Sequence, residues 1–160
     1  MNSATSTKID LTDTGSFRFW TPVTIRYSDQ DAMAHVNNCA YAAYTEAGRT
    51  VFLGGLLNPD STPAIDFILA SVKIDYLNEM HYPGTVNVGT RIIRLGTKSM
   101  TLGTGMFHDG ACVATAESVN IFLEVESRQT IPIPVSIRAT LDADPMQKGR
   151  EMGCSPESHS

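Results

Sequence analysis

Hydrophobic and polar residues along the first third of the chain predict a strand followed by a long helix. Aromatic and β-branched residues alternate in part with polar ones over 17–27, which is typical of a strand. Either Asn37 or Asn38 can accept a hydrogen bond from a free backbone N–H and so begin a helix. Gly54 and Gly55 are expected to end that helix in the left-handed conformation.

Apolar residues recur along this helix at intervals close to the helical period. They are Ala40, Ala43, Ala47, Val51 and Leu53 or Gly54. Alanine side chains project little from the backbone, so the three alanines would form a narrow face. We therefore expect this alanine face to be buried and the helix to lie close against a sheet.

After the helix the hydrophobic period changes to two, as expected of strands. Val72, Ile74 and Tyr76 alternate with polar residues, which predicts a half-buried strand. Three further strands are predicted, and their apolar runs lie over 86–92, 100–107 and 113–125.

The predicted strands are joined mostly by short turns. Asp109-Gly110 favours a two-residue hairpin, because such a turn needs positive φ at both central residues. Pro132 and Pro134 indicate that strand pairing ends soon after 125. The resulting order, a strand, a helix and then about four strands, predicts an α+β fold in which an antiparallel sheet of about five strands carries one long helix.

The length of the chain suits one compact domain. It has 160 residues, of which 42% are hydrophobic, and this is enough for a single core. Polar residues dominate both ends, so we expect mobile segments over 1–17 and 138–160 and one domain over 18–137.

Charge and composition narrow the possible partners and the compartment. The net charge is −5 and no basic run stands out, which argues against a nucleic-acid partner. No apolar run is long enough to span a membrane, and no secretory leader is visible at the start. Three well-separated cysteines suit free thiols in a reducing compartment, so a soluble cytoplasmic protein is expected.

The usual local signatures of hydrolases and nucleotide-binding proteins do not occur in the sequence. There is no G-x-S-x-G elbow, no H-E-x-x-H helix and no G-x-x-x-x-G-K-[ST] loop. His35, His81, His108 and His159 are widely scattered, and their spacing does not suggest a metal site. We expect no metal and no cofactor.

One segment carries a stronger signal than these patterns. Residues 27–49 read Tyr-Ser-Asp-Gln-Asp-Ala-Met-Ala-His-Val-Asn-Asn-Cys-Ala-Tyr-Ala-Ala-Tyr-Thr-Glu-Ala-Gly-Arg. This segment resembles the opening motif of hotdog-fold thioesterases of the 4-hydroxybenzoyl-CoA thioesterase type. Comparable features continue through the Pro83-Gly84 turn, 96–99 and 132–134, so the resemblance covers roughly 18–137. Ala34 departs from the family pattern, which usually has Gly there.

The resemblance implies hydrolysis of an acyl-coenzyme A thioester at a sparse site. Asp31 matches the family's catalytic carboxylate, either as the nucleophile or as the base that activates water. The backbone N–H of Asn38 matches the oxyanion donor at the helix start. His35 could orient Asp31 or water, and Asn37 could hold water or a carbonyl. No cofactor beyond the coenzyme A of the substrate is implied.

The remaining candidates would bind substrate. Tyr41 is a candidate wall of the acyl pocket, although its helix position favours a packing role. Arg91, Lys98 and Ser99 are candidates for binding the phosphates of coenzyme A. Family members pair into homodimers or homotetramers, usually with the active site at the dimer interface.

Other interpretations of the same residues stay open at this point. Asp29 and Asp31 are also typical turn residues, His35 could be a structural histidine, and both asparagines cap helices without touching a substrate. Two other functions compete with hydrolysis. One is a hotdog dehydratase or hydratase acting on 3-hydroxyacyl or enoyl thioesters, and the other is an acyl-thioester-binding protein without turnover.

Overall fold

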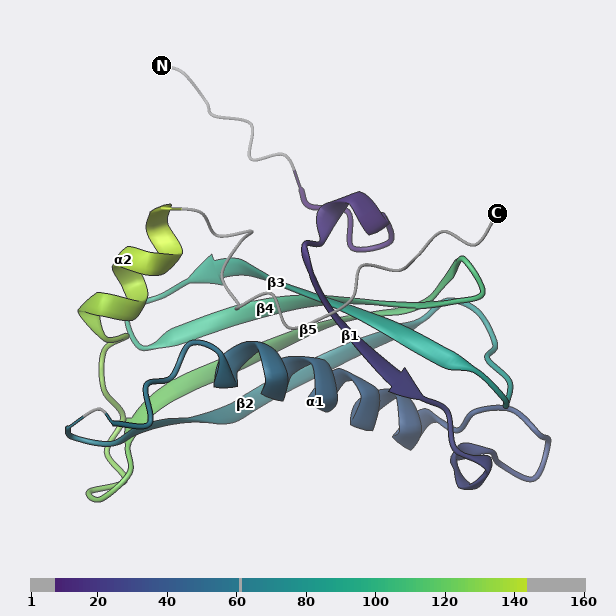
Figure 1. Cartoon of the computed structure of the whole chain (residues 1–160), viewed down its shortest axis with the longest axis horizontal. Coiled ribbons are helices and arrows are strands. Elements are labelled where there is room, and N and C mark those ends of the chain that lie inside the picture. The colour runs from purple at the N-terminus through teal and green to yellow at the C-terminus, as the bar shows by residue number, and fades with distance from the viewer. Residues whose placement is uncertain (1–7, 61, 144–160) are drawn as a thin grey trace, which may run out of the picture.

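The computed structural model describes residues 8–60 and 62–143 (Figure 1). Its elements are η1 (Thr14–Ser16), β1 (Phe19–Thr24), η2 (Tyr27–Asp29), α1 (Asn38–Gly54), β2 (Ile65–Tyr76), β3 (Thr85–Leu95), β4 (Ser99–His108), β5 (Ala111–Glu124) and α2 (Val135–Ala143). No helix in this described part of the chain is long and apolar enough to cross a membrane.

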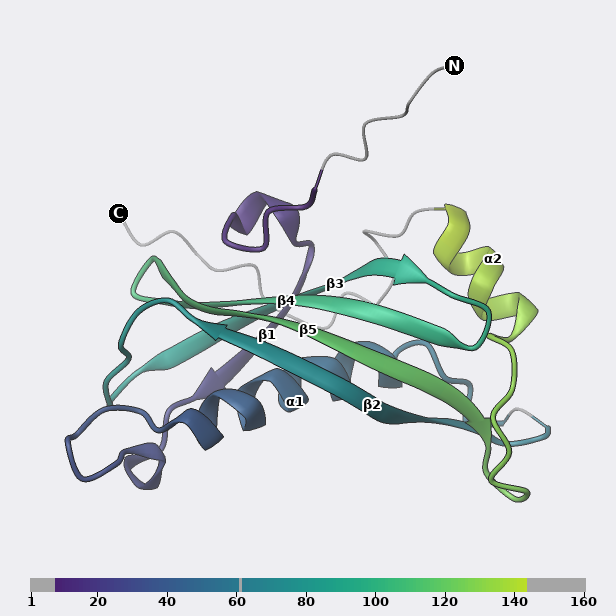
Figure 2. The same cartoon turned by 180° about the vertical axis from the view of Figure 1, so that it is seen from behind.

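The five strands form one antiparallel sheet in the order β1-β3-β4-β5-β2. The long helix α1 lies along one face of this sheet (Figures 1 and 2). The predicted α+β architecture is therefore confirmed. Its first strand is shorter than predicted, because the chain leaves the sheet after Thr24 and turns into η2.

The predicted hairpin between β4 and β5 is confirmed by its backbone angles. Asp109 has a φ of 49° and Gly110 a φ of 78°, so both central residues are left-handed. Strand β5 ends at Glu124, as the following prolines indicated.

The buried face of α1 differs from the predicted alanine face. Ala43 and Val51 are exposed, and the core side of the helix instead carries Ala40, Tyr41, Tyr44, Thr45, Gly48, Arg49, Phe52 and Leu53. Burying the large rings removes far more apolar surface from water than burying methyl groups, so the helix is rotated toward them.

The end of α1 also differs from the prediction. Gly55 has a φ of −70° and a ψ of −18°, which is right-handed, and its N–H donates to Val51 O at 3.2 Å. The helix therefore stops without a left-handed glycine.

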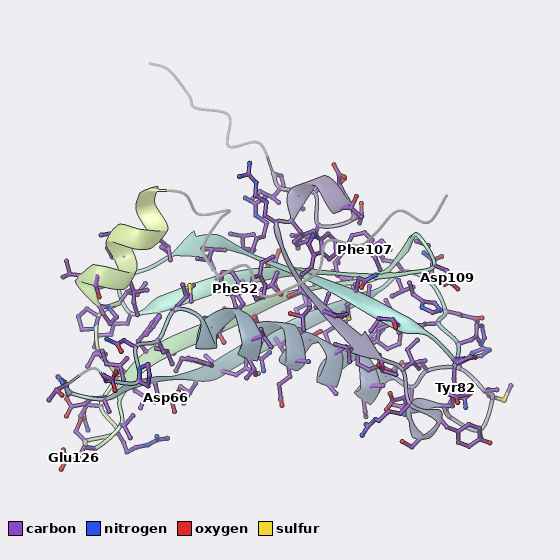
Figure 3. All side chains as sticks on the ribbon, in the orientation of Figure 1. Phe52, Asp66, Tyr82, Phe107, Asp109 and Glu126 are labelled. Atoms are coloured by element: carbon purple, nitrogen blue, oxygen red, sulfur yellow. The ribbon has the colours of Figure 1, made fainter. Side chains whose placement is uncertain are left out.

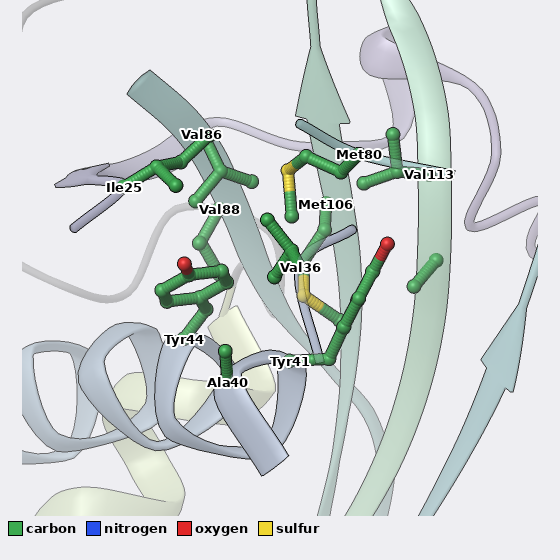
Figure 4. Close-up of a cluster of buried hydrophobic side chains, with 11 residues drawn as sticks. Ile25, Val36, Ala40, Tyr41, Tyr44, Met80, Val86, Val88, Met106 and Val113 are labelled. Carbon is green, nitrogen blue, oxygen red and sulfur yellow. The ribbon is translucent and has the colours of Figure 1, made fainter. Parts of the chain in front are cut away.

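The helix and sheet enclose two clusters of buried side chains. One lies near the start of α1 and includes Val36, Tyr41, Tyr44 and Met80 (Figure 4). The other lies near the helix end and centres on Phe52. Loops that enter and leave α1 are thus tied to the core at both ends of the helix.

The expected domain boundaries fall inside packed structure. Phe17 is buried, and a Cβ on Gly89 would lie 2.5 Å from its ring, so the segment before β1 packs closely on the sheet. Helix α2 spans the expected boundary at 137, and Ile137 belongs to the second core cluster. The remainder of the predicted tails, 1–7 and 144–160, lies outside the described residues.

Candidate active site

A buried carboxylate organises the loop between β1 and α1. Asp29 is 3% exposed and accepts hydrogen bonds from Arg26 N at 2.9 Å and from the Tyr44 hydroxyl at 2.7 Å. The Arg26 guanidinium also donates to it, at 2.9 and 3.1 Å. Burial alone would raise the pKa of the Asp29 carboxyl, but these donors outweigh it and hold that pKa below its ordinary value. Asp29 is therefore the structural member of the Asp29–Asp31 pair.

Asp31 lies in a short loop whose two ends are joined by backbone hydrogen bonds. Gln30 and Val36 form an antiparallel bridge, and Asp31 N donates to His35 O at 2.8 Å. One carboxylate oxygen, Oδ1, accepts from Met33 N at 2.8 Å and from His35 N at 3.2 Å. The other oxygen has no hydrogen-bond partner among the described residues, and Asp31 is exposed. The carboxylate is thus held by one oxygen and open through the other.

The turn beyond Asp31 requires an unusual backbone conformation. Ala34 has a φ of 60°, the left-handed region that glycine adopts at little cost. Its N–H donates to Asp31 O at 3.1 Å. The departure from the family's glycine therefore falls at a strained position, and the loop keeps the conformation despite the alanine.

The two asparagines at the helix start differ in function. The Asn37 amide is used internally: its oxygen accepts from Ala40 N at 2.9 Å and its nitrogen donates to Asp29 O at 2.8 Å. Asn38 is exposed and is the first residue of α1, so its backbone N–H precedes the helical hydrogen bonds. Within the described residues that N–H has no partner, and it is available to an external acceptor.

A surface hollow lies beside the helix start. It has a volume of about 270 Å³ and is lined by Asn38, Tyr41, Tyr76, Leu77, Asn78 and Glu79. Tyr41 is 3% exposed, donates from its hydroxyl to Asn78 O at 3.3 Å and meets Tyr76 edge to face. Tyr41 therefore both packs in the core and borders the hollow.

The His35 ring lies beside Glu79 and His81 and does not contact Asp31. Only the backbone of His35 hydrogen-bonds to Asp31, through its N–H and its carbonyl oxygen, whereas its ring Nε2 lies 3.7 Å from Glu79 Oε2. The His81 ring lies beside it, with ring centroids 4.9 Å apart. Two histidines that are scattered in the sequence thus meet at this site. Glu79 carries no sequence signal of its own, because only the fold brings the link between β2 and β3 to this loop.

The predicted phosphate-binding residues are not brought to Asp31 within one chain. Arg91 donates to Ser16 O at 2.9 Å and so anchors the segment before β1. Lys98 and Ser99 lie where β3 turns into β4, at the α2 end of the sheet and opposite the start of α1 (Figure 1). Figure 3 shows the same separation of ends, with Tyr82 and Asp109 at one and Asp66 and Glu126 at the other.

The antiparallel sheet, the helix α1 and the loop before it are the features that assign this protein to a family. The family model described as Thioesterase-like superfamily matches residues 25–141, and the chain belongs to this family. A search of the curated proteins found no match.

Solved structures agree with the family and establish the hotdog fold. A predicted thioesterase from Bacillus stearothermophilus is 32% identical, with a TM-score of 0.70, over 78% of this chain and 94% of that one. A thioesterase from Thermus thermophilus, crystallised with coenzyme A and Zn, is 28% identical, with a TM-score of 0.68, over 78% and 91%. The PA5185 protein from Pseudomonas aeruginosa is 26% identical, with a TM-score of 0.69, over 82% and 93%.

Proposed function

We propose that this protein hydrolyses an acyl-coenzyme A thioester to a carboxylic acid and free coenzyme A. One observation carries the proposal: among the described residues, one carboxylate oxygen of Asp31 and the N–H of Asn38 have no partner, and the two residues lie on one loop and helix start, where Asn38 lines a hollow. The family supports it, and so does the structural relative crystallised with coenzyme A.

The thioester itself makes so sparse a site sufficient. The thiol that leaves has a pKa of roughly 8.5, so it can depart as a thiolate without protonation by a strong acid. As the carbonyl carbon is attacked, negative charge develops on its oxygen. The Asn38 N–H and the positive end of the α1 dipole would stabilise that charge.

Asp31 can supply the attack in two ways. As a nucleophile, its carboxylate oxygen bonds to the carbonyl carbon, the C–S bond breaks and a mixed anhydride forms, which water then hydrolyses. As a base, it removes a proton from a water molecule that attacks the same carbon directly. After a single turnover in ¹⁸O-water, ¹⁸O in the Asp31 carboxylate would identify the anhydride route, because only an anhydride attacked by water at the Asp31 carbon can leave the label there.

The proposed active unit is a homodimer, which could associate further into a tetramer. Strand β2 is at the edge of the sheet, spans Ile65–Tyr76 and exposes Ile68, Leu69 and Val72. A second copy pairing on this edge would continue the sheet. It would also cover the hollow, which Tyr76 of β2 borders. Lys98 and Ser99 could then reach the bound coenzyme A only from the second copy.

The test is thiol release from a panel of short, medium, long and aromatic acyl-coenzyme A thioesters and an acyl carrier protein thioester. We expect Asp31→Asn to lower kcat/KM about a hundredfold or more, a loss of about 2.7 kcal/mol in transition-state stabilisation. Asp60→Asn, an exposed carboxylate outside this loop, is the matched control and should keep full activity.

Neither alternative function would release thiol in this assay, and only the state of the acyl chain would tell the two apart. A dehydratase would change the acyl chain without releasing thiol, and a binding protein would retain the thioester intact. Absence of thiol release across the panel would therefore refute hydrolysis, and full activity of Asp31→Asn would refute the proposed site.

A further inference from the structure

Three potential metal-ligating atoms converge between the Asp31 loop and the link from β2 to β3. They are one ring nitrogen of His35, one ring nitrogen of His81 and a carboxylate oxygen of Glu79, and all lie within 4.8 Å of one another. Each histidine Nε2 is 3.7 Å from the same oxygen, Glu79 Oε2. His35 belongs to the loop before α1, whereas Glu79 and His81 belong to the link between β2 and β3. The tertiary fold brings these two segments together.

These distances do not describe a hydrogen-bonded cluster. At 3.7 Å, each nitrogen is beyond the 2.7–3.2 Å range of an N–H···O bond. Two ligands held about 2.0–2.1 Å from one tetrahedral ion are roughly 3.4 Å apart. The two histidine–glutamate spacings are therefore a few tenths of an ångström wider than those around a shared ion, the third spacing is within 4.8 Å, and rotation of these partly exposed side chains can close the site.

The orientation of His81 matches that of a metal ligand. Its Nδ1 lies 3.1 Å from Ala34 O, so Nδ1–H donates to this carbonyl and leaves the Nε2 lone pair facing Glu79. Metal-binding histidines are usually oriented in this way, by donating their other ring N–H to a carbonyl or a carboxylate. The carbonyl belongs to the left-handed residue of the Asp31 loop.

The site is also reachable from solvent. Glu79 and His81 border a hollow of about 470 Å³. The three ligands leave at least one coordination position for water. An ion can therefore enter without displacing any core side chain.

We propose that His35, Glu79 and His81 bind a divalent transition-metal ion of the zinc class. Two imidazoles and one carboxylate suit Zn²⁺, whereas Mg²⁺ and Ca²⁺ prefer oxygen ligands. The ion would clamp the loop that carries Asp31 to the link between β2 and β3. This inference rests on the ligand geometry and does not depend on the proposed hydrolysis.

The test is metal binding by the full-length, chelator-treated protein, measured by calorimetry with Zn²⁺ and by visible absorption with Co²⁺. We expect one ion per chain, a Co²⁺ spectrum typical of low coordination number, and a higher Tm with Zn²⁺. Glu79→Gln and His81→Ala should each weaken binding about a hundredfold or more. Asp109→Asn, which changes an exposed carboxylate 3.3 Å from His108, is the matched control and should bind normally.

Circular dichroism and the Tm without metal establish that each variant is folded. Unchanged Zn²⁺ affinity in both ligand variants would overturn the proposal, as would a thiolate-to-cobalt charge-transfer band, because the ion would then be bound by cysteine. If the wild-type protein binds the metal but releases no thiol, hydrolysis is refuted and the metal site is supported. The two proposals can therefore fail independently.

Discussion

At the scale of single residues, Asp29 and Asp31 show how environment separates two identical side chains. Asp29 is buried among donors, including Arg26 and Tyr44, whereas Asp31 is exposed and held by two backbone N–H groups. The first arrangement stabilises the loop, and the second leaves a carboxylate oxygen open. Stability and proposed chemistry are therefore assigned to different residues of one motif.

The lowered pKa of Asp29 predicts a loss of stability in acid. Because its folded-state pKa is below the unfolded value of about 3.9, its contribution is present above that pH and is lost as pH falls through the folded pKa. Asp29→Asn should lower the free energy of unfolding by about 1–3 kcal/mol at pH 7. Urea unfolding at several pH values checks this, and a difference that did not shrink toward pH 3 would contradict it.

Strain at Ala34 predicts a stabilising substitution. A left-handed non-glycine residue costs about 1–2 kcal/mol, and the extra chain entropy of glycine offsets about 0.4–1 kcal/mol of the relief. Ala34→Gly should therefore raise the free energy of unfolding by up to about 1.5 kcal/mol. Ala42→Gly, on the exposed face of α1, should lower it by a similar amount. Chemical unfolding of both variants tests the opposite signs.

At the scale of elements, the distance between α1 and the sheet depends on Gly48. A Cβ at this position would lie 2.6 Å from Val88 Cγ1 and 3.0 Å from Thr90 Oγ1. Val88 and Thr90 are both fully buried and leave no room for movement. The close helix packing that the sequence suggested is therefore real, but a glycine on a different face provides it.

Two glycines of α1 should respond oppositely to alanine. Gly48→Ala forces the helix and β3 apart and should cost about 1–3 kcal/mol. Gly54→Ala meets no atom within 4 Å and should gain up to about 1 kcal/mol from helix propensity. Thermal and urea unfolding of the pair provide the test, and equal shifts would contradict the packing argument.

At the scale of the whole molecule, the edge strand β2 leaves apolar side chains exposed. Val72 is 41% exposed and Tyr76 49% exposed, although the alternation of β2 predicted a half-buried strand. Val72, Ile74 and Tyr76 have only one neighbouring strand, β5, to cover them. A second copy would complete their burial.

Dimer formation through β2 predicts a mass of at least twice 17.4 kDa in solution. Val72→Lys places a charge on the pairing edge and should shift the protein toward the monomer. Val135→Lys, at the exposed start of α2, should leave the mass unchanged. Light scattering after size-exclusion chromatography measures both, and a wild-type monomer would refute the proposed assembly.

Local chemistry determined much of this protein from sequence alone. The asparagine cap of α1, the Asp109-Gly110 hairpin and the end of β5 depend on residues that are neighbours in the chain, and each prediction was confirmed, with Asn37 as the cap of the two asparagines that the sequence offered. The family motif at 27–49 likewise identified the loop that carries the candidate site.

The tertiary structure determined the features that depend on contacts between residues far apart in the sequence. The buried face of α1, the use of Arg91 as an anchor and the meeting of His35 with Glu79 and His81 all follow from the packing of the helix and the register of the strands. The hydrophobic period of a sequence predicts that a helix has a buried face, but it does not determine which large side chains fit into the core. Pairing between distant segments sets that space, because strand register fixes which side chains face α1.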